Sequence, residues 1–198
     1  MTEKAPVKNE VSLEALKAGD KAELARMVEL YSEPIYRLGL KMLGSEQDAE
    51  DVLQETFMKA LRSIQQFEGR SSISTWLYRI AMNEIFLTLR KKKPMEESLD
   101  GYDSDSEEPE KPKEIIDWCC LPENELMNAE VRKTMSQAIE KLSPALRSVF
   151  ILRDMNHLSV KETADALGIS EAAVKTRLLR ARLQLREDLS VYFSHKMP

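Results

Sequence analysis

Apolar side chains recur along most of the chain at the three- and four-residue spacing of amphipathic helices, and strand-like alternation is almost absent. One such stripe follows Ser45, a good N-cap residue with Asp48 in the first turn after it. Its predicted buried positions are Ala49, Val52, Leu53, Thr56, Ala60, Leu61 and Ile64. The pattern predicts an all-α fold.

Two more helices are predicted in the first half of the chain. One begins with a capping box formed by Asp20 and Glu23 and runs to Gly44, and Pro34 either kinks it or starts a new segment. The other follows a loop over residues 67–72 and continues to the basic run 91–93. Its apolar positions are Trp76, Leu77, Ile80, Ala81 and Leu89.

Residues 94–125 are predicted to be a flexible acidic linker between two small helical domains, 1–93 and 126–198. The segment contains four prolines and has a net charge of −10, so it cannot bury enough apolar surface to order itself. A short apolar cluster within it is interpreted as a docking point, on the chain's own domains or on a partner. Its members are Ile115, Ile116, Trp118 and Leu121.

The second half predicts a helix-turn-helix. Ser143 precedes Pro144 at a helix start, and Ser159 with Glu162 forms a capping box. Gly168 stands where a helix end needs a left-handed residue, and Ser170 can cap the next helix. The expected contacts between the two helices come from Val160, Ala164, Leu167, Ile169, Val174 and Leu178.

The second helix of this unit is strongly basic. Residues 171–182 contain four basic residues and one acidic residue, and the basic ones are Lys175, Arg177, Arg180 and Arg182. Long cations among small residues are typical of a recognition helix that enters the major groove of DNA. The alternative is a basic, solvated helix in a small bundle.

The total charge of −5 argues against nucleic-acid binding. Without the linker and its charge of −10, however, the rest of the chain has a net charge of +5. Residues 46–55 contain five acidic residues and no basic one, whereas residues 59–93 have a net charge of +6. This polarity suits a protein held between a basic protein surface and a nucleic acid. For the acidic segment alone, a helix-dipole effect is the simpler alternative.

The loop over residues 67–72 suggests a base-binding site. Phe67 stands beside Gly69 and small hydroxyl residues, next to a basic helix, and such a loop can receive an unstacked base. A core aromatic residue at a helix end is the alternative for Phe67, and Trp76 is most simply a core residue.

Several functions are excluded. No apolar run is long enough to cross a membrane, the N-terminus has no signal-peptide core, and no Gly-rich phosphate loop occurs. Cys119 and Cys120 are adjacent, and His157 and His195 are the only histidines, so we expect no metal, no cofactor and no catalytic residues. A reducing cytoplasmic location fits best.

Two parts of the chain closely resemble extracytoplasmic-function (ECF) sigma factors of the sigma-70 family. Segments 48–57 (DAEDVLQETF), 67–69 (FEG) and 75–83 (TWLYRIAMN) resemble region 2 of that family. The stretch from 142–144 (LSP) to 174–182 (VKTRLLRAR) resembles region 4. The resemblance covers roughly residues 20–93 and 126–190. One position departs from it, because Leu87 stands where many relatives have Asp.

The resemblance implies three binding surfaces. Contacts with core RNA polymerase would come from Asp48, Asp51, Gln54 and Glu55, supported by Phe57. Contacts with a promoter −10 element, including a loop that captures a flipped base, would come from Phe67, Glu68, Gly69, Arg70, Ser71, Ser72, Asn83, Arg90, Lys91 and Lys92. Contacts with a −35 element would come from Ser170, Lys175, Thr176, Leu179 and Arg180, with Arg177 and Arg182 as phosphate or packing residues.

The leading hypothesis is therefore a sigma factor that binds core RNA polymerase and directs promoter-specific initiation without catalysing a reaction. Promoter DNA and core polymerase are the expected partners, and the family adds an anti-sigma factor as an optional one. The main alternative is a helix-turn-helix regulator that acts without replacing the sigma subunit, and a second is a helical adaptor that uses its acidic face.

Overall fold

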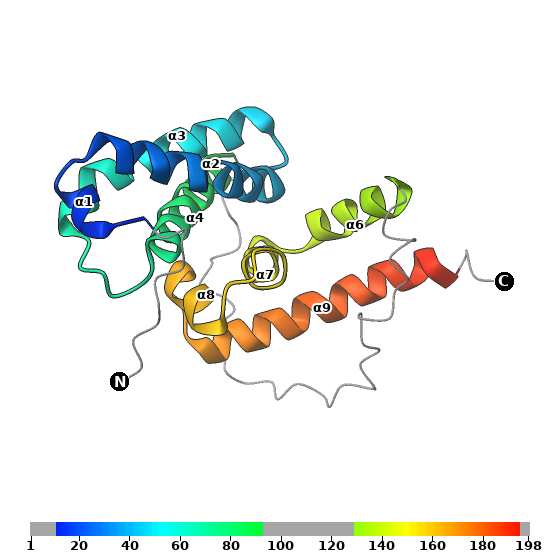
Figure 1. Cartoon of the computed structure of the whole chain (residues 1–198). Coiled ribbons are helices and arrows are strands. Elements are labelled where there is room, and N and C mark those ends of the chain that lie inside the picture. Colours follow the sequence, from blue (N-terminus) through cyan, green and yellow to red (C-terminus); the bar gives the residue numbers. More distant parts are fainter. Residues whose placement is uncertain (1–10, 93–128, 195–198) are drawn as a thin grey trace.

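The computed structural model describes residues 11–92 and 129–194, and all regular structure in these ranges is helical (Figure 1). The first block contains α1 (Leu13–Lys17), α2 (Lys21–Leu43), α3 (Glu46–Ser63), the 3₁₀ turn η1 (Ile64–Gln66) and α4 (Ile73–Lys92). The second block contains α6 (Ala129–Lys141), α7 (Pro144–Phe150), the π-helical turn η4 (Ile151–Met155), α8 (Val160–Leu167) and α9 (Glu171–Ser194). The predicted all-α class is confirmed.

The start of α2 differs from the predicted capping box in one respect. Asp20 caps the helix by accepting hydrogen bonds from the backbone N–H groups of Ala22 and Glu23. The Glu23 carboxylate, however, accepts from the backbone N–H of Ser12 instead, at 2.5 Å. This bond ties the segment before α1 to the start of α2.

Helix α2 then continues without interruption to Gly44. Pro34 lies inside it, so it does not start a new helix. Gly44 adopts a left-handed conformation (φ +68°), as a residue after a helix end commonly does.

The buried stripe of α3 is largely as predicted, with one error. Ala49 and Ala60 are completely buried and Val52 is nearly so, whereas Leu61 is 42% exposed. Leu61 lies about 100° around the helix from the buried Ala60, which turns it away from α2 and α4.

Helices α2, α3 and α4 pack against one another in the first block (Figure 1). Gly39 of α2 meets Ala49 of α3 so closely that a Cβ atom at position 39 would lie 3.1 Å from the Ala49 Cα. Lys59 and Glu84 join α3 to α4 through a 2.5 Å ion pair. The close approach of α2 and α3 therefore favours glycine at position 39.

The helix-turn-helix forms as its caps predict. Ser159 and Glu162 complete a reciprocal capping box at the start of α8, and Gly168 ends that helix with φ +66°. Ser170 then accepts a hydrogen bond from the backbone N–H of Ala173 at 3.1 Å, at the start of α9. Three of the predicted apolar contacts, Ala164, Val174 and Leu178, form a small buried core with Val149, and the other three pack against it.

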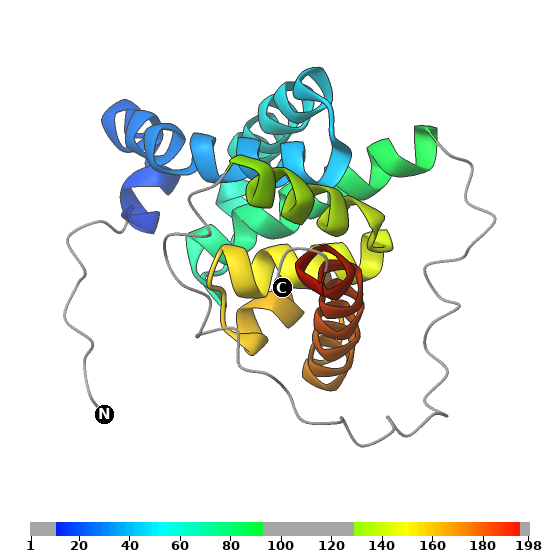
Figure 2. The ribbon, with the colours of Figure 1, turned by 90° about the vertical axis from the view of Figure 1, so that its right-hand side faces the viewer.

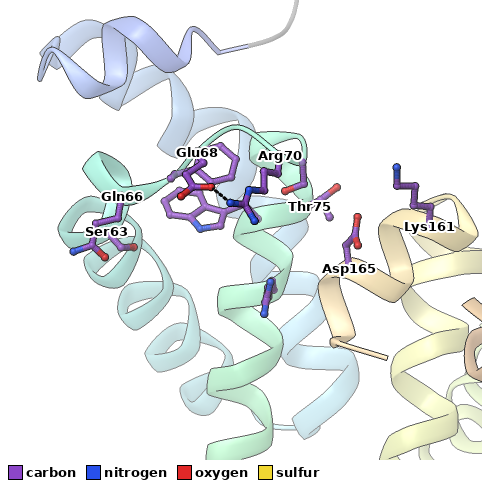
Figure 3. A pocket seen from close by; sticks show the side chains of 11 residues that line it. Ser63, Gln66, Glu68, Arg70, Thr75, Lys161 and Asp165 are labelled. Carbon is purple, nitrogen blue, oxygen red and sulfur yellow. Dashed lines mark ion pairs between the residues drawn. The ribbon is translucent and has the colours of Figure 1, made fainter. Parts of the chain in front are cut away.

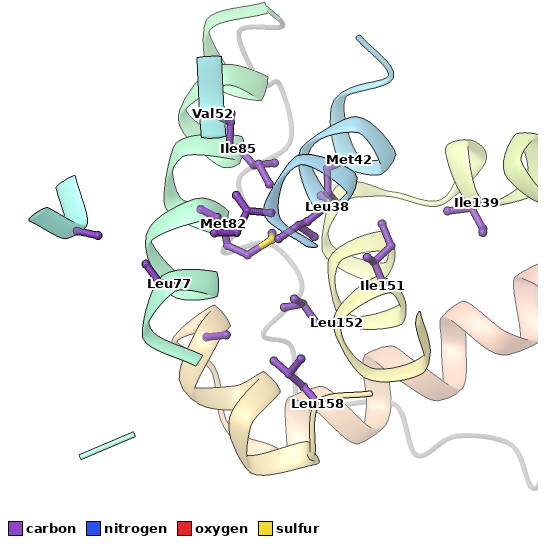
Figure 4. Packing of buried hydrophobic residues seen from close by; sticks show 14 of the residues in the cluster. Leu38, Met42, Val52, Leu77, Met82, Ile85, Ile139, Ile151, Leu152 and Leu158 are labelled. Atoms are coloured by element: carbon purple, nitrogen blue, oxygen red, sulfur yellow. The ribbon is translucent and has the colours of Figure 1, made fainter. Parts of the chain in front are cut away.

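The two blocks pack against each other and share one hydrophobic core (Figures 2 and 4). Leu38, Met42 and Met82 of the first block belong to the same buried cluster as Leu152 and Leu158 of the second. Contacts between α4 and α8 and between α2 and α7 form the interface. The division into domains 1–93 and 126–198 therefore stays a prediction about folding units.

The predicted linker 94–125 lies outside the described residues. The same holds for its apolar cluster around Trp118, for the Cys119–Cys120 pair and for His195.

Candidate functional surfaces

A hollow of about 540 Å³ lies beside the loop 67–72, where the resemblance places base capture (Figure 3). This volume falls within the ~300–1,000 Å³ of typical small-molecule sites. The first block contributes Ser63, Gln66, Phe67, Glu68, Arg70, Ser71, Thr75, Trp76 and Arg79, and α8 contributes Lys161 and Asp165. The hollow thus contains two aromatic rings and several polar side chains that could contact a nucleobase.

The aromatic part of the hollow is a stacked pair. The rings of Phe67 and Trp76 lie 4.7 Å apart, with 23° between their planes. Phe67 is 8% exposed and Trp76 is half-buried, so the pair is anchored in the core as well as lining the hollow. Both interpretations of these residues, as core aromatics and as part of a base site, are compatible with this placement.

The loop itself is held by backbone and side-chain contacts. Gly69 has φ +72°, and a Cβ atom there would lie 3.2 Å from a methyl group of Leu13 in α1. The Ser72 hydroxyl accepts a hydrogen bond from the backbone N–H of Thr75 at 3.1 Å, which makes it a cap of α4. Glu68 and Arg70 form an exposed 2.5 Å ion pair at the rim of the hollow. Such exposed pairs contribute little to stability, so both side chains remain available to a ligand.

The basic end of α4 continues from the hollow. Asn83, Arg90, Lys91 and Lys92 are all exposed. Lys92 forms an ion pair with Asp48 at the start of α3. The pKa of the Asp48 carboxyl is lowered below its usual value. The hydrogen bond from Lys92 is the largest cause, and a hydrogen bond involving Ser45 is the next. Two residues expected to bind different partners are therefore paired with each other.

The outer face of α3 combines acidic and apolar side chains. Asp51, Gln54 and Glu55 are exposed. Phe57 is 8% exposed and packs in the hydrophobic core behind this face. Met58 and Leu61 are each just over 40% exposed, and they continue the face of Gln54 at the next two helical repeats. We did not predict these two residues as part of the surface, although their spacing from Gln54 indicates it.

The predicted recognition helix, α9, presents Lys175, Thr176 and Arg180 to solvent, whereas Arg177 and Leu179 are half-buried. The Thr176 hydroxyl donates to the Ala172 carbonyl at 3.1 Å. Three of the predicted −35 side chains thus share the exposed part of α9, whereas Leu179 is only partly accessible and Ser170 also serves as a cap.

Arg182 is held by the protein itself. Its Nε and Nη2 atoms donate to the two carboxylate oxygens of Asp154 at 2.9 and 2.8 Å. The hydrogen bond to Asp154 raises the pKa of Arg182. Since Asp154 belongs to η4, this pair ties α9 to the segment before α8, which favours the packing role over a phosphate contact.

The described residues contain no group of three or more His, Cys, Asp or Glu side chains arranged to hold a metal ion. Within residues 11–92 and 129–194, every helix is too short or too polar to span a membrane.

Comparison with known proteins identifies the family of this chain. The family model for sigma-70 region 2 matches residues 27–94, and that for sigma-70 region 4 matches residues 132–185. The ECF RNA polymerase sigma factor SigW of Bacillus subtilis is 37% identical over 177 residues, which cover 89% of this chain and 94% of the relative. The chain belongs to the ECF sigma factors of the sigma-70 family.

Other relatives of this sigma factor support the same assignment. The ECF RNA polymerase sigma-E factor of Haemophilus influenzae is 31% identical, covering 89% of this chain and 93% of that protein. In fold, the sigma factor is similar to CnrH, solved with the cytosolic domain of CnrY, at a TM-score of 0.65 and 22% identity over 90% of this chain and 95% of that one. It is also similar to RpoE of Bartonella quintana, solved with the anti-sigma factor NepR, at a TM-score of 0.62 and 24% identity over 85% and 98% of the two chains.

Proposed function

We propose that this sigma factor binds core RNA polymerase and directs initiation at promoters whose −35 and −10 elements it reads with α9 and with the hollow beside the loop 67–72. The observation that carries the proposal is the hollow itself, with its aromatic pair beside the basic helix α4. Bases that leave the stack are commonly held against aromatic side chains in such sites.

At the −10 element, we expect one unstacked base to enter the hollow and contact the Phe67–Trp76 pair. Gln66 and Arg79 line the hollow with hydrogen-bonding groups that can distinguish base edges. Arg90 and Lys91, which are exposed at the end of α4, would bind phosphates of the same strand.

At the −35 element, α9 would enter the major groove of the duplex. Lys175 and Arg180 are exposed and supply the long cations that such a helix uses for base edges and phosphates. Arg182 would not contact DNA itself and would instead hold α9 in position through its pair with Asp154.

Polymerase would bind the outer face of α3. Asp51 and Glu55 supply negative charge, and the exposed Met58 and Leu61 add apolar area beside them. Acidic groups around an apolar centre suit a basic partner, since charge steers the encounter and apolar contact adds affinity.

The proposal includes no catalysis by this chain, and it places the protein in the cytoplasm with polymerase and the chromosome. An anti-sigma factor is a further proposed partner. It is supported by the solved complex of the similar RpoE with NepR, which is named an anti-sigma factor.

Run-off transcription with purified core polymerase and a library of genomic fragments tests the function. We expect specific transcripts that require the full chain. Lys175→Ala with Arg180→Ala should remove promoter selectivity while the protein still co-purifies with polymerase. Absence of any promoter-dependent transcript would reject the proposal, and a chain that binds specific duplex DNA without affecting the choice of sigma subunit would indicate the helix-turn-helix regulator.

The polymerase face is tested separately by Asp51→Arg with Glu55→Arg. The double variant should lose co-purification with core polymerase because it reverses the charge of the surface. The matched control is Glu29→Arg with Glu33→Arg, which makes the same change in charge at the same spacing on the exposed side of α2. Equal retention of polymerase by the two double variants would refute the assignment of α3.

A further inference from the structure

The short helix α1 has no part in the surfaces described above, but it lies beside the segment that leads into the loop 67–72. It packs against α2 and against η1, the 3₁₀ turn that immediately precedes the loop (Figure 1). Val11, just before α1, is 7% exposed, and Leu16 within it is 1% exposed. Both belong to the same buried cluster as Ile64 of η1. An apolar core therefore fixes α1 to the element from which the loop emerges.

A hydrogen bond joins the C-terminal end of α1 to η1. The carbonyl groups at the end of a helix lack partners within the helix, so they need donors from elsewhere. Those of residues 14–16 accept from the backbone N–H groups of residues 18–20. The Lys17 carbonyl accepts instead from the Nε2 atom of Gln65, at 2.6 Å. Gln65 stands two positions before Phe67, which lines the hollow, so this bond holds the chain where it enters the loop.

Leu13, the first residue of α1, supports the middle of the loop. A Cβ atom at Gly69 would lie 3.2 Å from a Leu13 methyl group, so glycine leaves room for the Leu13 side chain directly beside the loop backbone. The two ends of the loop are held separately. The Phe67 N–H donates to the Ile64 carbonyl at 3.2 Å, and the Ser72 hydroxyl caps α4. Leu13 therefore contacts the loop between its two anchored ends.

The N-terminal end of α1 is tied to α2. The Ser12 hydroxyl caps α1 by accepting from the Ala15 N–H at 3.3 Å, and the Ser12 backbone N–H donates to the Glu23 carboxylate at 2.5 Å. Isolated helices of fewer than about 12 residues are marginal in water, so α1 depends on contacts of this kind. With Glu23 holding its start and Gln65 its end, α1 is a fixed support for the loop.

We propose that Leu13 and Gln65 are positioning residues for base capture, which hold the loop 67–72 in the conformation that binds the −10 strand. Neither residue lines the hollow, so they act through the loop and do not touch the base. A loop that is already in its binding conformation loses less conformational freedom when a ligand enters, and affinity rises accordingly. The inference rests on the proposed −10 function of the hollow.

The test uses the full chain bound to core polymerase and measures its affinity for a fluorescent single-stranded −10 oligonucleotide from a promoter found by run-off transcription. Abasic versions of the oligonucleotide, each lacking one base, identify the captured base as the one whose removal weakens binding most. Leu13→Ala removes the contact with Gly69, and Gln65→Met keeps the length of the side chain but cannot donate to Lys17. Leu13→Met and Gln65→Lys are the conservative variants, because they retain the apolar contact and the donor.

We expect Leu13→Ala and Gln65→Met each to bind the intact strand about three- to tenfold more weakly, because the loop then has to be ordered during binding. On the strand that lacks the captured base, both variants should bind as tightly as the unsubstituted protein. Leu13→Met and Gln65→Lys should regain most of the lost affinity. Leu30→Ala is the matched control, since Leu30 is a half-buried leucine of α2 that packs on the same core and does not line the hollow. It should lower the melting temperature and leave the −10 affinity unchanged.

Unchanged affinity of Leu13→Ala and Gln65→Met for the intact strand overturns the proposal. An equal loss on the intact and abasic strands does so too, as does a loss that Leu30→Ala reproduces, because either result indicates general destabilisation. If circular dichroism shows that Leu13→Ala does not fold, Gln65→Met decides by the same comparison, since it alters an exposed side chain. Failure of the proposed function has a different signature: the unsubstituted protein with polymerase would not distinguish the −10 strand from a scrambled one, which would overturn both.

Discussion

Arg182 and Asp154 show at the residue scale how an internal partner changes the role expected of a side chain. From the sequence, Arg182 is one of four cations on the recognition helix, with a phosphate contact or packing as its alternatives. The bidentate pair with Asp154 spans 28 positions, and nothing in the local pattern indicates it. That a positive charge lies at position 182 is clear from the sequence. Its pairing with Asp154 depends on how η4 packs beside α9 in the folded protein.

The salt dependence of promoter binding distinguishes these roles. With polymerase bound, Lys175→Ala or Arg180→Ala should each reduce the slope of log K against log salt concentration by about one, as expected for the loss of one phosphate contact. Arg182→Ala should leave the slope unchanged and instead lower the melting temperature. A reduced slope for Arg182→Ala would show that Arg182 reaches DNA.

The Asp48–Lys92 pair predicts a pH dependence. Lys92 depresses the pKa of Asp48 in the folded protein, so the pair stabilises the fold above the carboxyl's unfolded pKa of about 3.9 and loses this effect as the pH falls through the lower folded value. In thermal melts from about pH 6 to 2.5, the advantage of the natural chain over Lys92→Met should therefore disappear in the acid range. Lys91→Met, which removes an exposed cation beside it, is the control. A constant difference across the range would contradict the assignment.

At the scale of elements, caps were predictable because they involve only residues within one turn. Ser45, Ser143 and Ser159 each accept a hydrogen bond from the backbone N–H three residues later, as the sequence predicts. Features that depend on neighbouring helices were not predictable. The π-helical η4, the exposure of Leu61 and the diversion of Glu23 to Ser12 all depend on what packs beside them.

Gly39 tests the packing of α2 on α3. Alanine is the better helix former by about 1 kcal/mol, so Gly39→Ala would stabilise an isolated helix. Here the new Cβ would lie 3.1 Å from the Ala49 Cα, a backbone atom that cannot rotate away, and overpacking typically costs about 1–3 kcal/mol. We expect net destabilisation of about 1 kcal/mol in urea denaturation. A more stable Gly39→Ala protein would show that the helices can separate at this point.

For the whole molecule, the sequence predicted two helical blocks and the composition of each, but not their contact. Met42, Leu152 and Leu158 are spaced as core residues of their own blocks. The same spacing is compatible with one core shared by both blocks, so the sequence does not distinguish the two arrangements. A long acidic linker and binding to two different DNA elements also led us to expect two separate blocks. The hollow beside the loop 67–72 consequently includes Lys161 and Asp165, which the sequence did not indicate, because they are more than 80 positions from that loop.

The surroundings of Arg147 predict how the protein responds to changes in ionic strength. Arg147 of α7 and Lys41 of α2 reach across the interface between the blocks to the Met42 carbonyl oxygen and the Met155 sulfur atom. Neither contact is a pair of opposite charges that dissolved ions could screen. Phosphate contacts, in contrast, weaken steeply as salt is added. From about 0.05 to 0.5 M salt, where the Debye length falls several-fold, the radius of gyration should stay constant while DNA affinity drops. Expansion over that range would mean that exposed ion pairs hold the blocks together. A constant radius would mean that salt can remove DNA from this protein but cannot open it.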